Sequence, residues 1–171
     1  MSDGGPLPHR TCGPCTACCV LLEIQDPAIA KPAGTPCRHL SAKGCGLHPH
    51  WPKLCQTWFC GWRLIPGLPE EWRPDLSGIL LYHVPCRESG YGPDAYMLCL
   101  SRGEAHLRDV AVLGFVQNMV ERRVPLYLML ELGKPDAKML FVNPHMTEPL
   151  ARQDGKLFIS TLAAMIRDLS L

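Results

Sequence analysis

The sequence contains no apolar run long enough to cross a membrane. Its longer apolar stretches, such as residues 110–116 (VAVLGFV), fall far below the roughly 18 residues that a bilayer span requires. The first ten residues lack the charged and then apolar pattern of a secretory signal. The formal net charge is only +1, which gives no basic footprint for nucleic acid. We therefore expect a cytoplasmic protein that binds neither a membrane nor a nucleic acid.

The sequence also lacks the common catalytic and cofactor motifs. It has no G-x-S-x-G, P-loop, H-E-x-x-H or dinucleotide-binding fingerprint. Asp75 and Asp154 have no partner in the sequence that would suggest acid–base chemistry. The sequence alone leaves open whether the protein is an enzyme.

Cysteine, by contrast, is abundant. The chain has ten cysteines, and eight of them precede residue 61: Cys12, Cys15, Cys18, Cys19, Cys37, Cys45, Cys55 and Cys60. Hydrophobic residues make up 47% and charged residues 19%, so the chain has enough apolar material for a core and is not of the disordered class. In a reducing compartment such a cluster indicates metal binding or catalysis rather than disulfide bonds.

Composition divides the chain into two regions. Eleven of the 17 prolines lie at or before Pro74, and turn-forming segments fill residues 10–73. A segment of this kind cannot bury enough apolar surface by itself and needs a staple, either a metal or disulfides. We therefore predict a loop-rich, cysteine-rich metal-chelating module over 10–73. Residues 74–171 should form an α+β region that holds most of the hydrophobic core.

The second region alternates between strand and helix patterns. Apolar runs predict strands at 77–85, 95–101, 125–132 and 137–143, and helical periodicity predicts helices at 104–123 and 155–171. The last helix should bury Leu157, Leu162, Met165, Ile166 and Leu169. On the first helix, helical spacing predicts a stripe of Leu107, Val110, Leu113 or Gly114, Gln117 and Val120. Further apolar residues should widen this face: Val112, Phe115, Val116 and Met119. Ser101 and Glu104 are predicted to form a capping box at the start of the helix. The order ββα-ββα predicts an α+β fold with an antiparallel sheet, helices on one face, and the cysteine module packed on it.

The spacing of the first cysteines points to a metal centre. Cys12, Cys15 and Cys18 follow C-x2-C-x2-C, which bacterial ferredoxins use to give three thiolates to one [4Fe–4S] cluster and which also suits zinc. We expect these three to share a centre. Cys18 and Cys19 are adjacent, so their side chains diverge, and one small ion would rarely take both. The adjacent pair therefore indicates one of two arrangements. Either Cys18 and Cys19 serve two different four-thiolate centres, or one of them is a ligand and the other is a packed or reactive thiol.

The whole series of cysteines resembles a known family. Cys12-x2-Cys15-x2-Cys18-Cys19, followed by Cys37, Gly44-Cys45, Pro52-x2-Cys55 and Cys60, is similar to the zinc- or iron-chelating family named for its CxxCxxCC stretch. The resemblance covers about the first 60 residues and implies metal chelation through all eight cysteines. An enzyme that methylates flagellin lysines carries a similar block. Where the family has Arg-Pro before the seventh cysteine and Arg after it, this chain has Trp51-Pro52 and Cys55-Gln56, so an anion-binding role of those arginines is not implied here.

Other candidate side chains surround this series. His39, His48 and His50 could replace a thiolate, although we expect them to be exposed loop residues because eight thiols already suffice. Cys86 and Cys99 lie in or beside apolar strands, where packed thiols are typical. Trp51, Trp58, Trp62 and Trp72 should shield the metal and supply a local core.

Three functions are consistent with these residues. The first, which we favour, is a protein that chelates zinc or an iron–sulfur centre for a structural or partner-binding role, since four thiolates leave no open position for substrate. The second is an iron–sulfur enzyme or electron carrier that acts on or modifies a partner protein. The third is a redox sensor that cycles a disulfide through Cys18 and Cys19 or a C-x-x-C pair.

Overall fold

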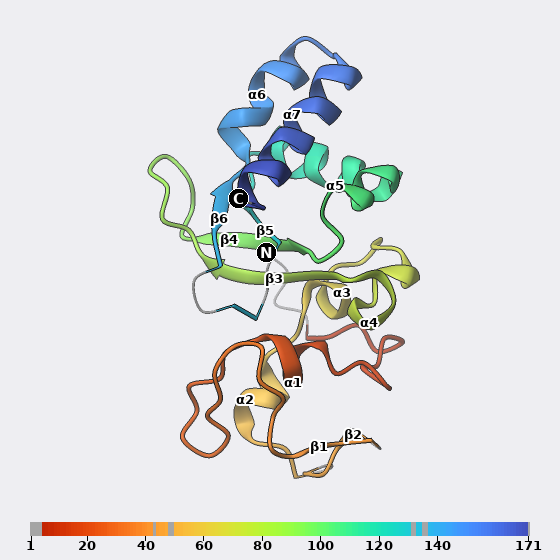
Figure 1. The fold of residues 1–171 in the computed structure, drawn as a ribbon, viewed down its shortest axis with the longest axis vertical. Helices are drawn as coiled ribbons and strands as arrows, with labels where there is room; N and C mark the ends of the chain where they lie inside the picture. The colour runs from red at the N-terminus through yellow and green to blue at the C-terminus, as the bar shows by residue number, and fades with distance from the viewer. Residues whose placement is uncertain (1–4, 43, 48–49, 131–132, 135–136, 171) are drawn as a thin grey trace. The chain divides into compact units, whose positions relative to one another are not determined.

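The chain folds into two compact units in the computed structural model, which describes residues 5–42, 44–47, 50–130, 133–134 and 137–170 (Figure 1). Unit 1 comprises Met1–Leu80 and Leu132–Ala137, and unit 2 comprises Leu81–Glu131 and Lys138–Leu171. The expected α+β class is confirmed. Composition placed the boundary between the two regions after Arg73, whereas the structural boundary falls after Leu80.

Unit 1 consists of short elements joined by loops. They are α1 (Ala17–Leu21), β1 (Leu40–Ser41), β2 (Gly44–Cys45), α2 (Lys53–Thr57), α3 (Gly61–Leu64), η1 (Glu70–Trp72) and α4 (Pro74–Ser77), and β1 pairs antiparallel with β2. No helix among these exceeds five residues, so helix propensity and helix packing contribute little to its stability. Its buried apolar residues are Ile29, Cys60, Trp62, Leu68, Trp72, Ile79 and Leu80.

A buried arginine organises the middle of unit 1. Arg10 is only 4% exposed, and its guanidinium donates hydrogen bonds to the carbonyl oxygens of Trp62, Ile65 (3.1 Å) and Leu68 (2.6 Å). Its Nε donates to Glu70 Oε1 (2.9 Å), and the guanidinium carbon lies 5.1 Å from the centre of the Trp62 ring. The planar guanidinium of arginine carries several N–H donors and can therefore serve several acceptors at once. Arg10 therefore fastens the segment before the first cysteines to the segment after Cys60.

Close packing between the backbones at Gly34 and Gly133 holds the segment around Gly133, which is distant in the sequence, in unit 1. Gly34 has φ +71, and a Cβ added there would lie 2.3 Å from the carbonyl oxygen of Gly133. Gly133 has φ +103, and a Cβ there would lie 3.0 Å from Gly34 Cα. Both positions need glycine because the backbones approach more closely than any side chain permits.

Unit 2 is built on a four-stranded sheet. Its strands are β3 (Ile79–Pro85), which begins in the last residues of unit 1, β4 (Asp94–Leu100), β5 (Leu126–Met129) and β6 (Met139–Phe141), hydrogen-bonded in that order. The predicted strands 77–85, 95–101, 125–132 and 137–143 correspond to these four, apart from residues 131–132, which lie outside the described residues. β5 and β6 are antiparallel, but β4 and β5 run parallel, so the sheet is mixed rather than antiparallel. The helical crossover between them makes this possible, since parallel neighbours need a long connection.

Helices cover one face of this sheet. They are η2 (Gly103–Arg108), α5 (Val110–Glu121), α6 (Asn143–Ala151) and α7 (Gly155–Leu169), and α5, α6 and α7 lie on the same side of the sheet in Figure 1. The order ββα-ββα is therefore confirmed, with α6 as an addition. The predicted inward residues of α7 are buried, except Leu157, which is half-buried, and Phe158 and Ala163 join them.

The first long helix matches its prediction in part. Its buried residues are Val112, Phe115, Val116 and Met119, the four predicted to widen the apolar face, whereas Val110, part of the stripe selected by helical spacing, is 81% exposed. The predicted capping box is wrong, because residues 103–108 form a 3-10 turn and the helix begins later. Asp109 caps it instead, with its side chain accepting a hydrogen bond from Ala111 N (2.9 Å).

Helix α6 contains two prolines, which explains why its sequence does not read as a helix. Pro144 lies in the first turn, where a missing N–H costs nothing, and Pro149 lies inside the helix. Asn143, which is 2% exposed, begins the helix and also anchors β5. Its Oδ1 accepts from Leu126 N (2.9 Å) and its Nδ2 donates to Val124 O (2.9 Å).

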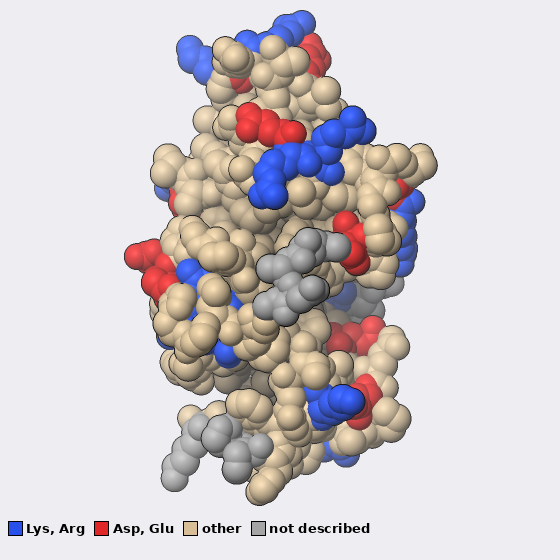
Figure 2. Space-filling model, turned by 180° about the vertical axis from the view of Figure 1, so that it is seen from behind, with Lys and Arg blue, Asp and Glu red and all other residues tan. Residues whose placement is uncertain are grey.

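The surface carries charges of both signs. On the face drawn in Figure 2, lysine and arginine side chains and aspartate and glutamate side chains are scattered over a mostly uncharged surface. Within the part of the chain that the structure describes, no helix is long and apolar enough to cross a membrane.

Candidate metal centre

The eight cysteines of the chelating series all belong to unit 1. Cys12 and Cys15 precede α1, Cys18 and Cys19 lie in α1, Cys37 precedes β1, Cys45 ends β2, Cys55 lies in α2, and Cys60 caps α3. All eight are free thiols; Cys12 and Cys55 are exposed, Cys60 is buried, and the other five are half-buried. Across the described residues, no three Cys, His, Asp or Glu side chains converge closely enough to hold a metal ion. The eight thiols are therefore gathered in one unit but not into one ligand group.

One group of thiols forms around the first turn of the chain. Cys15 N donates to Cys12 O (2.8 Å), which closes a tight turn between these two cysteines. Arg63 links this turn to Cys60: its Nη1 donates to Cys12 Sγ (3.4 Å), and its backbone N donates to Cys60 O (2.9 Å). Cys60 is 48 positions beyond Cys12 in the sequence, so this proximity is a property of the fold.

The pKa values of Cys15 and Cys60 reflect both burial and nearby N–H groups. Burial raises the pKa of each thiol, and charge on Cys60 raises that of Cys15 further. The backbone N–H groups of Ala17 and Asp75 oppose this at Cys15, and those of Arg63 and Trp62 oppose it at Cys60. N–H groups that point at sulfur favour the thiolate, which is the form that binds a metal.

A second group of thiols forms around the hairpin. Cys37 N donates to Cys19 O (2.8 Å), and Leu40 N donates to Cys37 O (2.9 Å). Leu40 is in turn the partner of Cys45 across the β1–β2 ladder. Charge on Cys19, Cys45 and Cys37 raises the pKa of the Cys55 thiol, after burial as the main cause. Cys55 therefore lies within electrostatic reach of these three.

The adjacent Cys18 and Cys19 share a hydrogen bond. The Cys18 thiol donates to the Cys19 sulfur, and this bond, together with burial, raises the pKa of Cys18 well above its ordinary value. The same bond lowers the pKa of Cys19 to about 7, against the effect of burial and with help from Lys31. The two thiols therefore titrate as a coupled pair, in which the first proton is lost more easily and the second less easily than from an isolated cysteine.

Sequence reasoning missed two cations beside these sulfurs. Arg63 contacts Cys12, as described, and its charge lowers the pKa of Cys60. Lys31 is 7% exposed and its Nζ donates to the carbonyl oxygens of Val20 (3.2 Å) and Leu22. Burial lowers the pKa of Lys31, and charge on Cys37, Cys19 and Cys18 raises it. Both cations are recognisable only once the fold is known, because an isolated lysine or arginine in a loop carries no signal.

The histidines do not join a metal-binding group in the described part of the chain. His39 is half-buried and its carbonyl oxygen accepts from Gly46 N (2.7 Å), His50 is exposed, and His48 lies outside the described residues. Of the four tryptophans, Trp62 and Trp72 are buried at 6% and 3% exposure, whereas Trp51 is 37% exposed. Two tryptophans therefore belong to the core of unit 1, and a shielding role around a metal stays a prediction.

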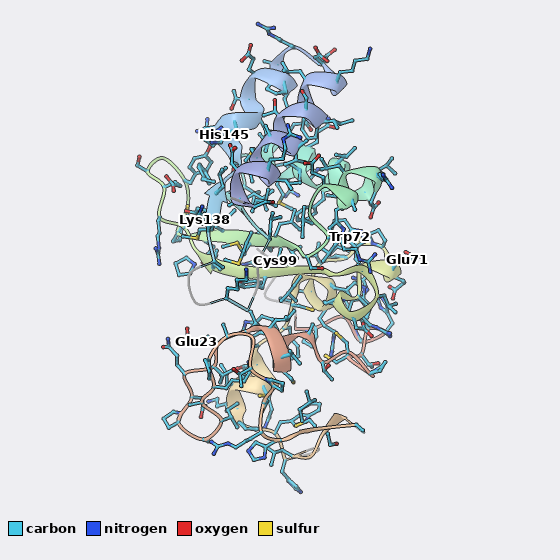
Figure 3. All side chains as sticks on the ribbon, in the orientation of Figure 1. Glu23, Glu71, Trp72, Cys99, Lys138 and His145 are labelled. Atoms are coloured by element: carbon cyan, nitrogen blue, oxygen red, sulfur yellow. The ribbon has the colours of Figure 1, made fainter. Side chains whose placement is uncertain are left out.

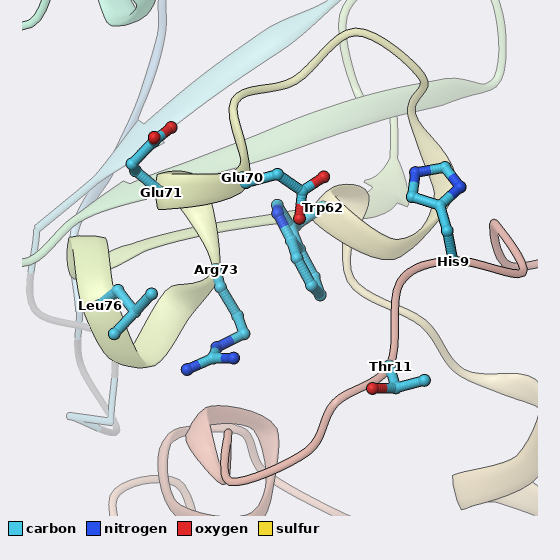
Figure 4. Close-up of a pocket in the computed structure, with 7 residues that line it drawn as sticks. All are labelled: His9, Thr11, Trp62, Glu70, Glu71, Arg73 and Leu76. Atoms are coloured by element: carbon cyan, nitrogen blue, oxygen red, sulfur yellow. The ribbon is translucent and has the colours of Figure 1, made fainter.

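An open cavity of about 410 Å³ lies elsewhere in unit 1. Figure 4 shows the residues that line it: His9, Thr11, Trp62, Glu70, Glu71, Arg73 and Leu76. None of the eight cysteines is among them, but the cavity adjoins the first thiols, because Thr11 precedes Cys12 and charge on Cys15 acts on Arg73. Its chemistry is mixed, with Arg73 already paired to Asp75 through two hydrogen bonds of 2.6 and 3.0 Å.

The two remaining cysteines belong to unit 2. Cys99, labelled in Figure 3, lies on β4 at 2% exposure, and burial raises its pKa to about 12. The Tyr82 hydroxyl donates a hydrogen bond to its sulfur. Cys86 is half-buried, with its thiol 3.9 Å from the Glu88 carbonyl oxygen.

Comparison with known proteins adds no assignment: no family model, curated protein or solved structure matches the chain. Whether these residues suit a metal is therefore judged from the chemistry of their donor atoms. Eight free thiols, with backbone N–H groups at Cys15 and Cys60 and the Arg63 guanidinium at Cys12, are suited to zinc or to an iron–sulfur centre, because both prefer thiolate ligands.

Proposed function

We propose that the protein chelates zinc or an iron–sulfur centre through Cys12, Cys15, Cys18, Cys19, Cys37, Cys45, Cys55 and Cys60, in a structural or partner-binding role in the cytoplasm. The observation that carries this proposal is the concentration of all eight free thiols in one unit with little secondary structure. A unit of this kind has few buried apolar side chains and gains stability from a bound metal.

The surroundings of the sulfurs support the same proposal. Neighbouring thiolates repel one another, and charge on other cysteines adds to burial in raising the pKa values of Cys15, Cys18, Cys55 and Cys60. A cation such as zinc removes this repulsion and makes thiolate formation favourable. Closed coordination by four thiolates leaves no position for a substrate, which favours structure or partner binding over catalysis.

The direct test is the metal content of protein purified without oxygen, measured together with its absorption spectrum. We expect a stoichiometric metal, and we expect Cys12→Ser and Cys15→Ser each to lower the metal content and the protease resistance of unit 1. Cys86→Ser is the matched control, because it removes a thiol of unit 2. Well-folded protein without metal would contradict the proposal, as would full metal retention in both variants.

The second candidate, an iron–sulfur enzyme or electron carrier that acts on a partner protein, is favoured by the exposure of Cys12 and Cys55. Ligands at the surface would bring a cluster within reach of a partner. Iron and sulfide in the purified protein, with visible absorption that bleaches on reduction, would select this candidate. Colourless protein with zinc would reject it. A redox sensor would instead lose free thiols on mild oxidation, with release of the metal.

A further inference from the structure

Three sulfur-containing side chains share one row across the sheet of unit 2. Cys99 on β4 is the register partner of Met129 on β5, and Met129 is in turn the partner of Met139 on β6. Residues opposite one another on neighbouring strands project from the same face of a sheet. Because neighbouring strands lie about 4.7–4.9 Å apart, one thiol and two thioethers follow one another closely. We call Cys99, Met129 and Met139 the sulfur row.

The sulfur row runs from the interior of unit 2 to the edge of its sheet. Cys99 is 2% exposed, Met129 is half-buried, and Met139 is 43% exposed on β6, the last strand of the sheet. Methionine is unbranched and has three rotatable bonds, so both thioethers can turn towards the Cys99 sulfur. An ion can therefore enter from solvent at Met139 and reach Cys99 along the row.

A second, mostly aromatic row lies beside the sulfur row on the same face. Met97, two residues before Cys99, is paired with Tyr127, and Tyr127 is paired with Phe141. Met97 and Tyr127 are both 3% exposed, and the Tyr127 and Phe141 rings have centroids 5.3 Å apart. Buried apolar surface therefore bounds the sulfur row on this side, which favours a bound group without net charge.

A hydroxyl group supports the Cys99 sulfur from the neighbouring strand. The Tyr82 hydroxyl on β3 donates a hydrogen bond to this sulfur. Strand β4 lies between β3 and β5, so Tyr82 reaches Cys99 from the strand opposite to that of Met129. A donor of this kind stabilises a thiolate and fixes its orientation, as the hydrogen-bond partners of metal ligands do.

The donor set indicates which ion would bind. Thiolate and thioether sulfurs are soft ligands, which Cu(I) prefers and hard cations such as Mg²⁺ and Ca²⁺ do not. One thiolate neutralises a monovalent cation, whereas a dication would keep a positive charge beside buried apolar side chains, at a high cost in free energy. Zinc, moreover, takes thiolate, imidazole and carboxylate ligands rather than thioethers.

We propose that Cys99, Met129 and Met139 form a binding site for one Cu(I) ion in unit 2. The site is independent of the proposed function, because it uses none of the eight cysteines of unit 1. On binding, the Cys99 S–H bond breaks, its proton passes to solvent, and a bond between copper and sulfur forms. The two thioethers donate lone pairs without losing a proton, and the copper stays monovalent throughout.

Methionine methyl NMR of the full chain tests this site, because each of the seven methionines reports separately. Protein labelled with ¹³C at these methyl groups is titrated with Cu(I) under reducing, oxygen-free conditions until the thiols of unit 1 are also saturated. We expect the Met129 and Met139 signals to shift with a common midpoint. The Met119 and Met165 signals, from α5 and α7, should not move. Unchanged Met129 and Met139 signals in excess Cu(I) would overturn the proposal.

Variants identify the ligands. Cys99→Ala should abolish the common shift, and a shift of Met139 that survives it would overturn the site, because it would show binding by an exposed thioether alone. Met139→Leu keeps the apolar volume and should raise the midpoint at Met129 by about tenfold or more, whereas Met119→Leu, the matched control, should not change it.

Tyr82→Phe removes the donor to the Cys99 sulfur without removing a ligand. It should raise the midpoint by about tenfold, and an unchanged midpoint would exclude a role of Tyr82 in the site. Circular dichroism before each titration shows whether the variant is folded. Since the signals come from unit 2, they stay readable whether or not unit 1 binds a metal, so this proposal and the proposed function can fail separately.

Discussion

At the scale of single residues, Arg10 is the clearest case of a side chain on which a whole unit depends. Its guanidinium serves three buried carbonyl oxygens and one carboxylate, from residues 52 to 60 positions further along the chain. Nothing in the local sequence marks it, because an arginine after a proline-rich start resembles any solvated charge. Its importance comes from long-range contacts that only the folded chain contains.

Removal of Arg10 should destabilise unit 1 strongly. Arg10→Ala leaves the Trp62, Ile65 and Leu68 carbonyl oxygens without their donor, at a cost of about 3 kcal/mol. Arg10→Lys should recover only part of it, since lysine cannot span the same acceptors. Tryptophan fluorescence during urea unfolding is the measurement, because all four tryptophans belong to unit 1.

The matched control for this prediction is Arg38→Ala. Arg38 makes one exposed hydrogen bond to the Ala28 carbonyl oxygen (2.9 Å), so its removal should change the unfolding free energy by less than about 0.5 kcal/mol. Equal effects of the two substitutions would show that the buried network of Arg10 contributes no special stability.

Cys99 gives unit 2 a pH dependence at alkaline pH. Burial raises its pKa from an ordinary value of 9.0 to about 12, so the folded protein keeps the proton that the unfolded chain loses. The stabilisation is complete below pH 9 and is lost as the pH rises towards 12, by about 1.4 kcal/mol per pH unit. Cys99→Ala should remove this slope, measured as the difference in urea midpoints by circular dichroism between pH 8 and pH 10.5.

Alkylation provides an independent check on Cys99. At pH 8.5 the folded protein should react with iodoacetamide at Cys86, which is half-buried, and not at Cys99, which is 2% exposed. Peptide mapping by mass spectrometry identifies the modified residue. Equal modification of both thiols would contradict the burial that the pH dependence requires.

At the scale of elements, helix α7 depends on Asp154, the residue that caps its N-terminus. Asp154 accepts hydrogen bonds from the backbone N of Lys156 and of Leu157, both 3.0 Å long. Asp154→Ala should lower the unfolding free energy of unit 2 by about 1 kcal/mol, while Asp154→Asn keeps the acceptor and should cost only a few tenths. Urea unfolding followed by circular dichroism measures both. Asp168→Ala, near the other end of the helix, is the control and should not destabilise it.

The helices and strands of unit 2 were largely predictable from the sequence. The direction in which the strands pair was predicted only in part. Strong periodicity identifies α7 and the four strands, because long apolar patterns report burial directly. The parallel pairing of β4 and β5 was missed, although a helix between them already indicates a crossover. On α5 the stripe that helical spacing selected was misjudged at Val110, which is exposed, whereas the residues predicted to widen the apolar face, Val112, Phe115, Val116 and Met119, are the buried ones.

For the candidate site, the sequence predicts the donors and not their grouping. The spacing of Cys12, Cys15 and Cys18 is local, so it can be interpreted without a fold. The approach of Cys60 to Cys12 depends on Arg63, Arg10 and the backbone bonds between their segments. Contacts of this kind connect residues about 50 positions apart, and no pattern within a short window encodes them.

At the scale of the whole molecule, the two units differ in how they are stabilised. Most of the buried apolar side chains belong to unit 2, which also has the four-stranded sheet and the long helices. Unit 1 has short elements, a buried arginine, a buried lysine and eight thiols. The hydrophobic effect therefore accounts for unit 2, while unit 1 requires a further contribution.

Metal removal should consequently affect the two units unequally. A four-thiolate metal site contributes about 10–16 kcal/mol in small zinc domains, more than the whole stability of a typical domain, so unit 1 should lose its fold when the metal is withdrawn. A chelator under reducing conditions should shift tryptophan emission to that of the unfolded chain. The helical circular dichroism, which comes mainly from α5, α6 and α7, should be largely retained.

Addition of zinc or reconstitution with iron and sulfide should reverse the change, because the thiols stay reduced. If tryptophan emission and the urea midpoint of unit 1 are the same with and without the chelator, the unit is held by its side chains alone, and the metal is cargo rather than part of the fold.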